Sequence, residues 1–337
     1  MRAAVMQGPG ALALEERSRP EPGPREVLVR ITSLGICGSD VSFFRHGRLG
    51  HSVFRAPVVL GHEPAGEVVA CGSGATRHRP GQRVSVEPGI PCGTCAQCRT
   101  GHYNRCADIR FLSDPPHDGA MQEYVVVHEA FAHPVPDRLS DDAAALIEPL
   151  SVALWAARRG RIGAGDRVLI TGAGPIGLLS AQVARALGAT EIAVSDVNPA
   201  RLAVASDFGA TTTILSADAP AAAAEVSPTV LVECSGSPRA LADTLPGTAA
   251  GGRVVLVGMG PEEVSLPLGL VQQRELTVGG VFRYANTWET GIELAASGRV
   301  DLDGLVTDRF PLTGAATALD PDTAVTTSVK TVIDLRD

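Results

Sequence analysis

The sequence lacks a surplus of positive charge. It has 29 Lys and Arg residues against 37 Asp and Glu residues, which gives a formal net charge of −8. A protein that holds a phosphate backbone concentrates basic residues on one face, and no dense run of Lys and Arg compensates for the deficit here. The composition therefore argues against nucleic-acid binding.

Long apolar runs are also missing. No stretch reaches the roughly 18 uninterrupted apolar residues that a membrane-spanning helix requires. Residues 1–17 contain acidic residues and a Gly-Pro pair where a signal peptide would need an apolar block. We therefore expect a cytoplasmic protein with no membrane partner.

The seven cysteines do not form the even set that is typical of a disulfide framework. Four of them, Cys92, Cys95, Cys98 and Cys106, lie within one short segment, which suits metal ligation in a reducing compartment. Four thiolates at this spacing can surround one tetrahedral zinc ion and leave no open position, so the site would be structural. An iron–sulfur cluster is the alternative, but the fourth cysteine lies well beyond the third and no redox-partner motif accompanies it.

At 337 residues the chain exceeds the usual size of a single hydrophobic core, so two domains are expected. Short β-branched runs such as 27–31 and 66–69 predict a mostly β first domain. From Arg167 onward, apolar strand-like runs alternate with Ala-rich helical stretches, which is the pattern of a parallel sheet. The pattern of strand-like and helical runs changes near Ser140 and again after Phe282. We therefore predict a mostly β domain formed by 1–152 and 284–337, and a doubly wound parallel-sheet domain at 153–283.

A glycine-rich motif lies at the start of the second domain. Gly172, Gly174 and Gly177 match G-x-G-x-x-G directly after a strand and at the start of a helix, where backbone N–H groups would meet a dinucleotide pyrophosphate. Asp196 follows about 20 residues later, where a carboxylate can hold a ribose hydroxyl and would repel a 2′-phosphate. The motif therefore predicts NAD, with NADP as the alternative because Arg201 could offset that repulsion.

A second set of metal ligands is spread over two Gly-rich segments, 35–40 and 61–66. Cys37, His62 and Glu63 would supply a thiolate, an imidazole and a carboxylate, and would leave room for water or substrate. An open position is the mark of a catalytic zinc. Taken singly, Cys37 could instead be a small core residue and His62 a turn residue.

These motifs together resemble the zinc-containing medium-chain dehydrogenase/reductase family over essentially the whole chain. The family signature G-H-E-x-x-G-x5-G is met by Gly61, His62, Glu63, Gly66 and Gly72. Within that family the chain is most similar to sorbitol dehydrogenases, as seen in residues 37–41, 147–152, 282–284, 286–288 and 306–312. The resemblance implies an α/β protein with a GroES-like catalytic domain and a Rossmann domain. It also implies two zinc ions per chain, NAD, and a homo-oligomer, with a tetramer favoured over a dimer.

The resemblance also assigns roles to individual residues. It implies that Cys37 and His62 bind the catalytic zinc, that Glu63 or Glu148 completes the zinc shell directly or through water, and that Ser39 contacts the reacting oxygen. Glu148 could alternatively be a capping carboxylate, and Arg283 could form an interdomain salt bridge. The substrate contacts expected on this basis are Phe43, Phe111, Asp114, Arg283 and Tyr284. The expected cofactor contacts are Gly172, Gly174, Pro175, Ile176, Gly177, Asp196, Arg201, Val257, Gly258, Met259 and Phe282.

Two positions depart from the sorbitol enzymes. The chain has Ser42 where they have His, and Phe43 where they have Tyr. His46 or His51 could relay protons instead, although either could equally be a loop residue. Asp114 adds a carboxylate that would suit a cationic or hydroxyl-rich ligand.

The sequence thus predicts a zinc-dependent enzyme that transfers a hydride from a secondary alcohol of a polyol to NAD. A similar Ser-Phe sequence occurs in aminocyclitol dehydrogenases, so a cyclitol or aminocyclitol dehydrogenase is the main alternative. Threonine-type and simple-alcohol dehydrogenases also remain open. A non-catalytic protein on the same scaffold is disfavoured, because it would have no need of an open zinc site.

Overall fold

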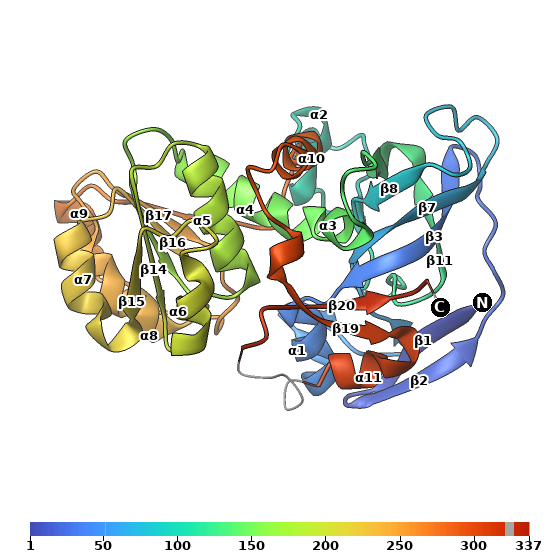
Figure 1. The fold of residues 1–337 in the computed structure, drawn as a ribbon, viewed down its shortest axis with the longest axis horizontal. Helices are drawn as coiled ribbons and strands as arrows, with labels where there is room; N and C mark the ends of the chain where they lie inside the picture. The colour runs from blue at the N-terminus through green and yellow to red at the C-terminus, as the bar shows by residue number, and fades with distance from the viewer. Residues whose placement is uncertain (51, 321–326, 337) are drawn as a thin grey trace. The chain divides into compact units, whose positions relative to one another are not determined.

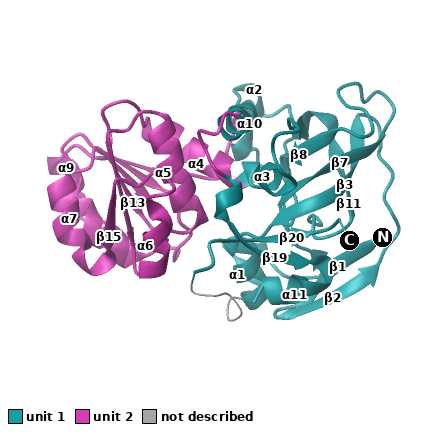
Figure 2. Cartoon of the chain, in the orientation of Figure 1, with its two compact units in different colours: residues 1–148, 288–296, 302–337 teal, residues 149–287, 297–301 magenta. Residues whose placement is uncertain are grey.

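The computed structural model describes residues 1–50, 52–320 and 327–336. The chain forms two compact units, coloured separately in Figure 2. Unit 1 contains 1–148, 288–296 and 302–337, and unit 2 contains 149–287 and 297–301. Among the described residues, no helix has both the length and the apolar character needed to cross a membrane.

The main sheet of unit 1 has seven strands in the order β12-β8-β7-β3-β20-β19, with β11 paired to β3. Its strands are β3 (Glu26–Gly35), β7 (Glu63–Cys71), β8 (Arg83–Val86), β11 (Tyr124–His128), β12 (Ala132–Pro134), β19 (Val306–Pro311) and β20 (Lys330–Asp334). A three-stranded sheet, β2-β1-β6, is formed by β1 (Arg2–Gly8), β2 (Ala11–Glu16) and β6 (Val58–Val59). Two short hairpins are formed by β4 (Arg48–Leu49) with β5 (Ser52–Val53), and by β9 (Gly89–Ile90) with β10 (Arg110–Phe111).

Strand β3 is the centre of unit 1. It pairs antiparallel with β7, β11 and β20, and its side chains at Val27, Val29, Ile31 and Leu34 are fully buried. Fully removing a Val, Ile or Leu side chain from water stabilises a fold by about 1.5–3 kcal/mol, so this strand anchors the core. Because β20 lies against β3, the last part of the described chain completes the sheet that the first part begins (Figure 1).

The helices of unit 1 are short. They are α1 (Gly38–His46), α2 (Ala96–Arg99), α3 (Asp141–Ala145), α10 (Trp288–Ala296) and α11 (Ala315–Ala318), with 3₁₀ turns η1 (Tyr103–Arg105), η2 (Glu129–Phe131), η5 (Asp303–Leu305) and η6 (Leu312–Gly314). The hydroxyl of Ser140 accepts a hydrogen bond of 2.9 Å from the Ala143 N–H and so caps α3, as expected for a Ser before an acidic first turn.

Unit 2 is built on a six-stranded parallel sheet in the order β15-β14-β13-β16-β17-β18. The strands are β13 (Arg167–Thr171), β14 (Glu191–Asp196), β15 (Thr212–Leu215), β16 (Val230–Glu233), β17 (Arg253–Leu256) and β18 (Thr277–Gly280). In chain order this is 3-2-1-4-5-6, the doubly wound order whose ligand crevice lies where β13 meets its neighbours. The parallel sheet that the alternation after Arg167 predicts is confirmed.

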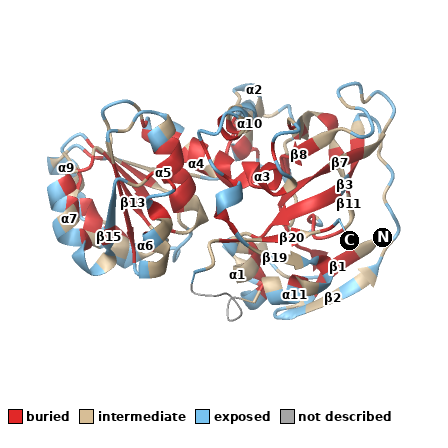
Figure 3. Ribbon diagram, in the orientation of Figure 1, coloured by how far each residue is buried: buried red, intermediate tan, exposed pale blue. Residues whose placement is uncertain are grey.

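Helices cover both faces of that sheet. They are α4 (Ile147–Gly160), α5 (Pro175–Ala186), α6 (Pro199–Ala205), α7 (Ala219–Val226), α8 (Pro238–Thr244) and α9 (Leu268–Gln273), with 3₁₀ turns η3 (Ser216–Asp218) and η4 (Leu245–Gly247). Figure 1 shows α4 and α5 on one side of the strands and α7 and α9 on the other. The central strands are therefore buried, as Figure 3 shows, while the helices expose their outer faces.

Helix α4 begins earlier than the sequence predicts. The sequence after Pro149 predicts a helix over 151–159, but the structure places the start of α4 at Ile147. Pro149 then lies in the first turn, where its missing N–H removes no helical hydrogen bond. The proline therefore permits the helix to begin before it.

Candidate active site

The pairing of β3 with β7 assembles a metal-ligand cluster in unit 1. Cys37 follows β3 and precedes α1. His62 directly precedes β7 and Glu63 is its first residue, with Gly35 opposite Glu63 in the register. One ligand atom from each of Cys37, His62 and Glu63 lies within 4.8 Å of the others. Two segments separated in sequence are thus brought together by the central strands of the sheet.

The close approach of β3 and β7 requires glycine at position 35. A Cβ atom on Gly35 would lie 2.0 Å from Oε2 of Glu63, which is far inside van der Waals contact. Any side chain there would push the Glu63 carboxylate away from Cys37 and His62. Gly35 in the segment 35–40 therefore serves the site geometry.

The residues of this cluster fit zinc. A thiolate, an imidazole and a carboxylate oxygen are the ligand types that zinc takes in proteins, and three protein ligands leave one tetrahedral position for water or substrate. Glu148, the other expected carboxylate, is buried in the first turn of α4, but the three-residue cluster does not include it.

Asp40 contacts the Nδ1 atom of the His62 ring. Its Oδ1 lies 3.3 Å from Nδ1 of His62 and also accepts hydrogen bonds from the N–H of Gly61 and the hydroxyl of Ser113, both at 3.2 Å. Burial alone would lower the pKa of His62, yet the charge and hydrogen bond of Asp40 and contact with Cys37 raise it well above the ordinary value. With Nδ1 occupied in this way, the ring presents Nε2 as its metal-binding nitrogen.

Lys330 pairs with the third ligand. Its Nζ lies 2.6 and 2.8 Å from the two carboxylate oxygens of Glu63 and donates to the carbonyl of Ile36 at 2.8 Å. Only 3% of Lys330 is exposed, and burial alone would lower its pKa, but the charge of Glu63, with smaller contributions from Cys37 and Glu148, raises it. This ammonium group balances part of the negative charge that the ligands carry.

The end of β10 borders the cluster, and a loop follows it. The ring of Phe111 lies 5.6 Å from that of His62, and Asp114 accepts a hydrogen bond of 2.6 Å from the hydroxyl of Ser52. Two expected substrate contacts are thereby placed here, Phe111 at the end of β10 and Asp114 in the loop that follows. A third, Phe43, is buried on α1.

The possible proton-relay groups lie on or near α1. Ser39 is half-buried in the first turn, two residues after Cys37, and Ser42 is half-buried one turn later. His46 is exposed in the last turn. His51 lies outside the described residues.

The four clustered cysteines meet in a lobe of unit 1 around α2. The sulfur atoms of Cys92, Cys95, Cys98 and Cys106 all lie within 4.8 Å of one another. Hydrogen bonds from the backbone of Thr94 and Cys95 lower the pKa of Cys92 to about 6, whereas burial raises the pKa of Cys98 to about 12. Four sulfur ligands at these separations fit one tetrahedral zinc with no open position.

In unit 2, the glycine motif forms the turn between β13 and α5. A Cβ atom on Gly177 would lie 1.8 Å from the carbonyl oxygen of Gly172, whereas one on Gly174 would meet nothing within 4 Å. The turn therefore closes tightly on itself and leaves open space at Gly174, as a pyrophosphate requires. Asp196 ends β14, and its carboxylate accepts hydrogen bonds from the N–H groups of Ala173 at 2.6 Å and Asn198 at 2.7 Å. These residues fit a dinucleotide.

The other expected cofactor residues follow the carboxyl ends of strands in the same unit. Val257, Gly258 and Met259 come directly after β17, and Met259 is 65% exposed. Phe282 is 60% exposed and carries the guanidinium of Arg283 over its ring at 4.9 Å, while Tyr284 is buried. The buried Nε of Arg201, on α6, has no hydrogen-bond partner among the described residues.

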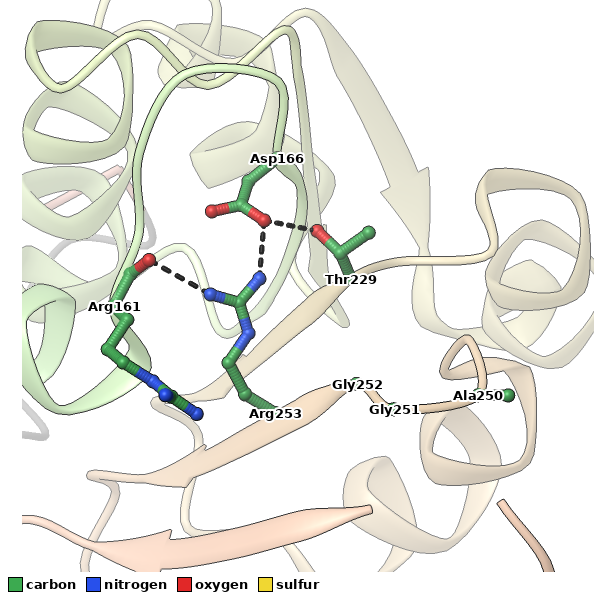
Figure 4. Close-up of a pocket in the computed structure, with 7 residues that line it drawn as sticks. All are labelled: Arg161, Asp166, Thr229, Ala250, Gly251, Gly252 and Arg253. Carbon is green, nitrogen blue, oxygen red and sulfur yellow. Dashed lines mark hydrogen bonds and ion pairs between the residues drawn. The ribbon is translucent and has the colours of Figure 1, made fainter. Parts of the chain in front are cut away.

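A hollow of about 370 Å³ lies at the opposite edge of the parallel sheet. Figure 4 shows Asp166 there, accepting hydrogen bonds from the Thr229 hydroxyl and the Arg253 guanidinium. Its lining residues are Arg161, Asp166, Thr229, Ala250, Gly251, Gly252 and Arg253. Because these residues precede or begin β13, β16 and β17, the hollow is separate from the glycine turn and Asp196.

Sequence motifs alone do not assign Asp40 or Lys330 to the site. Asp40 lies within the segment 35–40, so its spacing from Cys37 was available as a signal. Lys330 has no local motif and is 267 residues away from Glu63.

Comparison with known proteins gives a consistent result. Residues 23–137 match the alcohol dehydrogenase GroES-like domain family, and residues 175–297 match the zinc-binding dehydrogenase family. The chain is 42% identical to the sorbitol dehydrogenase of Gallus gallus over 326 residues, which cover 94% of this chain and 92% of the relative.

Two solved structures have the same fold. One is a protein from Sinorhizobium meliloti 1021 bound to NADP, with a TM-score of 0.92, 31% identity and 99% of each chain covered. The other is a short chain alcohol dehydrogenase from Escherichia coli CFT073 complexed with NADH, with a TM-score of 0.92, 29% identity and 99% of each chain covered.

Proposed function

The chain belongs to the zinc-binding alcohol dehydrogenase family and is an oxidoreductase, and on that premise we propose that it oxidises a secondary alcohol of a polyol to a ketone with NAD as hydride acceptor. The open cluster of Cys37, His62 and Glu63 carries this proposal. A zinc ion bound there would supply Lewis acidity toward the alcohol oxygen, and NAD would accept the hydride. The reverse reaction would use the same residues.

The protein's own residues prepare this site before substrate arrives. Asp40 fixes the ring of His62 through Nδ1, and Lys330 holds the carboxylate of Glu63 through both oxygens. Partners of this kind orient metal ligands and tune their basicity. The cluster is therefore preorganised by residues that do not themselves need to touch the substrate.

The hydroxyl proton of the alcohol must leave as the hydride does. We assign this step to Ser39, whose hydroxyl lies in the first turn of α1 close to Cys37 in the chain and can accept the proton and pass it to solvent. Ser42 occupies the position of the histidine in sorbitol dehydrogenases, so the outward path would run through hydroxyl groups and water.

Cofactor choice is assigned to Asp196. Its carboxylate ends β14 beside the glycine turn, where it can hold a ribose hydroxyl and repel a 2′-phosphate. The solved relatives include both an NADH and an NADP complex, so they do not distinguish the two cofactors. The preference for NAD is therefore argued from Asp196. Asp196→Ala should weaken NAD binding and reduce the preference for NAD over NADP, as measured by Kd for each cofactor. An unchanged preference would refute the assignment.

The reaction is tested by following NAD reduction with protein purified without chelators. The substrates should include sorbitol and other linear polyols, inositols, aminocyclitols, threonine and simple primary alcohols. Turnover of linear polyols by the wild type, and its loss in Cys37→Ser, is the expected result. Turnover of primary alcohols alone would contradict both the polyol assignment and the proposed roles of Arg283 and Tyr284.

A cyclitol or aminocyclitol dehydrogenase is a second candidate. It is favoured by Ser42 and Phe43 on α1, and by the Asp114 carboxylate near Ser52, which suits a cationic amine. Activity confined to cyclitols in the same panel would select this candidate.

The family relationship also favours a homo-oligomer that acts in the cytoplasm, with a tetramer before a dimer. Size-exclusion chromatography with light scattering would measure the assembly. A monomer would contradict it.

A further inference from the structure

We infer that Glu233 is a positioning residue that biases the dinucleotide site of unit 2 toward the oxidised cofactor, by placing a buried negative charge among the loops that hold it. The inference rests on the proposed NAD-dependent function. It concerns the relative affinity for NAD⁺ and NADH.

Glu233 is the last residue of β16, the strand between β13 and β17. The carboxyl ends of these strands carry the glycine turn and the segment Val257–Met259. In a sheet of this order, a dinucleotide lies across the carboxyl ends of the strands, on both sides of the point between β13 and β16 where the strand order reverses. If its adenosine ribose is held at Asp196 on β14, its other half extends toward β16 and β17.

The Glu233 carboxylate is buried and receives hydrogen bonds from the end of β13 and from the loop after β16. Its Oε1 accepts from the Thr171 hydroxyl at 3.1 Å, from the Ser235 N–H at 2.8 Å and from the Gly236 N–H at 3.0 Å, and the Ser235 hydroxyl also donates to it. Glu233 is only 4% exposed. All of these groups can donate to the carboxylate, which is the pattern of an ionised acid.

Within the part of the chain that the structure describes, the charge of Glu233 has no cationic partner. Among the described residues, no Lys, Arg or His forms an ion pair with Glu233, and its partners are backbone amides and hydroxyl groups. Burial raises the pKa of the neighbouring Cys234 thiol to about 12, while a hydrogen bond with Ser180 lowers it and the charge of Glu233 adds a smaller increase. A buried charge that is solvated only by neutral dipoles retains a long electrostatic reach.

The main chain at Glu233 and Cys234 also links the carboxyl ends of β13, β16 and β17 by hydrogen bonds. The carbonyl oxygen of Glu233 accepts hydrogen bonds of 2.8 Å from the N–H groups of both Val257 and Gly258, and the N–H of Cys234 donates to the carbonyl of Thr171 at 2.9 Å. The charge is therefore at the point where the loops after β13, β16 and β17 converge. The oxidised nicotinamide ring is cationic and the reduced ring is neutral, so a fixed anion there favours the oxidised form.

The test compares Kd for NAD⁺ and for NADH by titration calorimetry of the zinc-loaded protein. Glu233→Gln removes the charge and keeps the shape. We expect it to weaken NAD⁺ relative to NADH by about tenfold, the size expected for one charge acting over ~10 Å at an effective dielectric constant of ~20. Thr171→Val is the matched control, because it removes one hydrogen bond from the carboxylate but leaves the charge in place.

Loss of loop positioning alone would weaken both cofactor forms to the same extent. An unchanged ratio in Glu233→Gln, or an equal change of ratio in Thr171→Val, would overturn the inference while leaving the proposed function intact. Failure of the wild type to bind either form would overturn the proposed function itself. If thermal melting shows that the Gln variant does not fold, Glu233→Met provides the same comparison without a buried amide.

Discussion

The imidazole of His62 shows how much of this site depends on residues behind the ligands. The carboxylate of Asp40 fixes Nδ1, and the same carboxylate accepts hydrogen bonds from Cys37 N–H, Gly61 N–H and the Ser113 hydroxyl. Burial alone would raise the pKa of Asp40, but the charge of His62 and the hydrogen bonds with His62, Cys37 and Gly61 lower it. A single carboxylate therefore orders α1, the turn before β7 and the loop after β10.

Asp40→Asn should weaken zinc binding at the cluster of Cys37, His62 and Glu63. The substituted side chain keeps the shape of Asp but loses the charge that supports His62, and changes of this kind cost roughly 10–100-fold in metal affinity or activity. Zinc titration with a competing chelator measures the affinity, and initial rates measure turnover. Ser113→Ala, which leaves the carboxylate in place, should have a much smaller effect. Wild-type zinc affinity in Asp40→Asn would contradict this account.

For individual residues, the sequence predicts the metal ligands better than it predicts the residues that pair with those ligands. Cys37, His62 and Glu63 stand in Gly-rich motifs that indicate a metal site, and the structure brings all three together. Lys330 could not be predicted, because nothing local to it marks a pairing with a residue 267 positions away. Only the pairing of β20 with β3 brings it to the site.

At the scale of elements, the cysteine lobe is built around its four clustered sulfur atoms. Cys92 to Cys106 lie in loops, α2 and a 3₁₀ turn, with little apolar core of their own: Cys106 is buried but Cys92 is exposed. A segment of this kind depends on its metal for a defined conformation.

Cys95→Ser should therefore remove one zinc ion per chain and lower the apparent Tm by about 5 °C or more. Elemental analysis gives the zinc content, and differential scanning calorimetry gives the Tm. Cys71→Ser, at a thiol of unit 1 outside the cluster, is the matched control. Unchanged zinc content in Cys95→Ser would disprove the structural site.

Glu129 fixes the loops around the amino end of β3. Its carboxylate accepts hydrogen bonds from the N–H groups of Thr76 at 2.8 Å and Arg77 at 3.0 Å, and pairs with Arg25 at 3.0 Å. The hydrogen bond from Arg77 is the largest cause that lowers its pKa from 4.5 to about 2. The unfolded chain therefore binds this proton more tightly than the folded one.

Glu129→Gln should consequently lower stability at neutral pH. The stabilisation from Glu129 is fully present above pH 4.5 and disappears as the pH falls toward about 2. Urea midpoints of the wild type and the variant should differ most at neutral pH and converge over that window. A difference that stayed constant through it would contradict the assignment.

The element order of unit 2 follows from its pattern, because each buried parallel strand is a short apolar run separated from the next by a helix. Unit 1 is harder to predict. Its strands are irregular, with bulges in the pairing of β3 and β7, and β20 pairs with β3 across most of the chain. Long-range pairing of this kind leaves no periodicity in the local sequence.

For the molecule as a whole, two separate metal sites predict two zinc ions per chain. Dialysis against a strong chelator should abolish turnover, and added zinc should restore it. Cys37→Ala and Cys95→Ser should each retain about one zinc ion, but only the first should lose activity while keeping its Tm. A single zinc ion in the wild type would show that one cluster is not a zinc site.

The pairing of Lys330 with Glu63 also has a consequence for how the protein is made. A ribosome adds about 5–20 residues per second, so the 267 residues between the two partners correspond to roughly 13–53 s of synthesis. Throughout that interval the nascent chain already contains Cys37, His62 and Glu63 but not the ammonium group that balances them. An early zinc ion would therefore meet a more anionic and less ordered set of ligands than the finished protein offers.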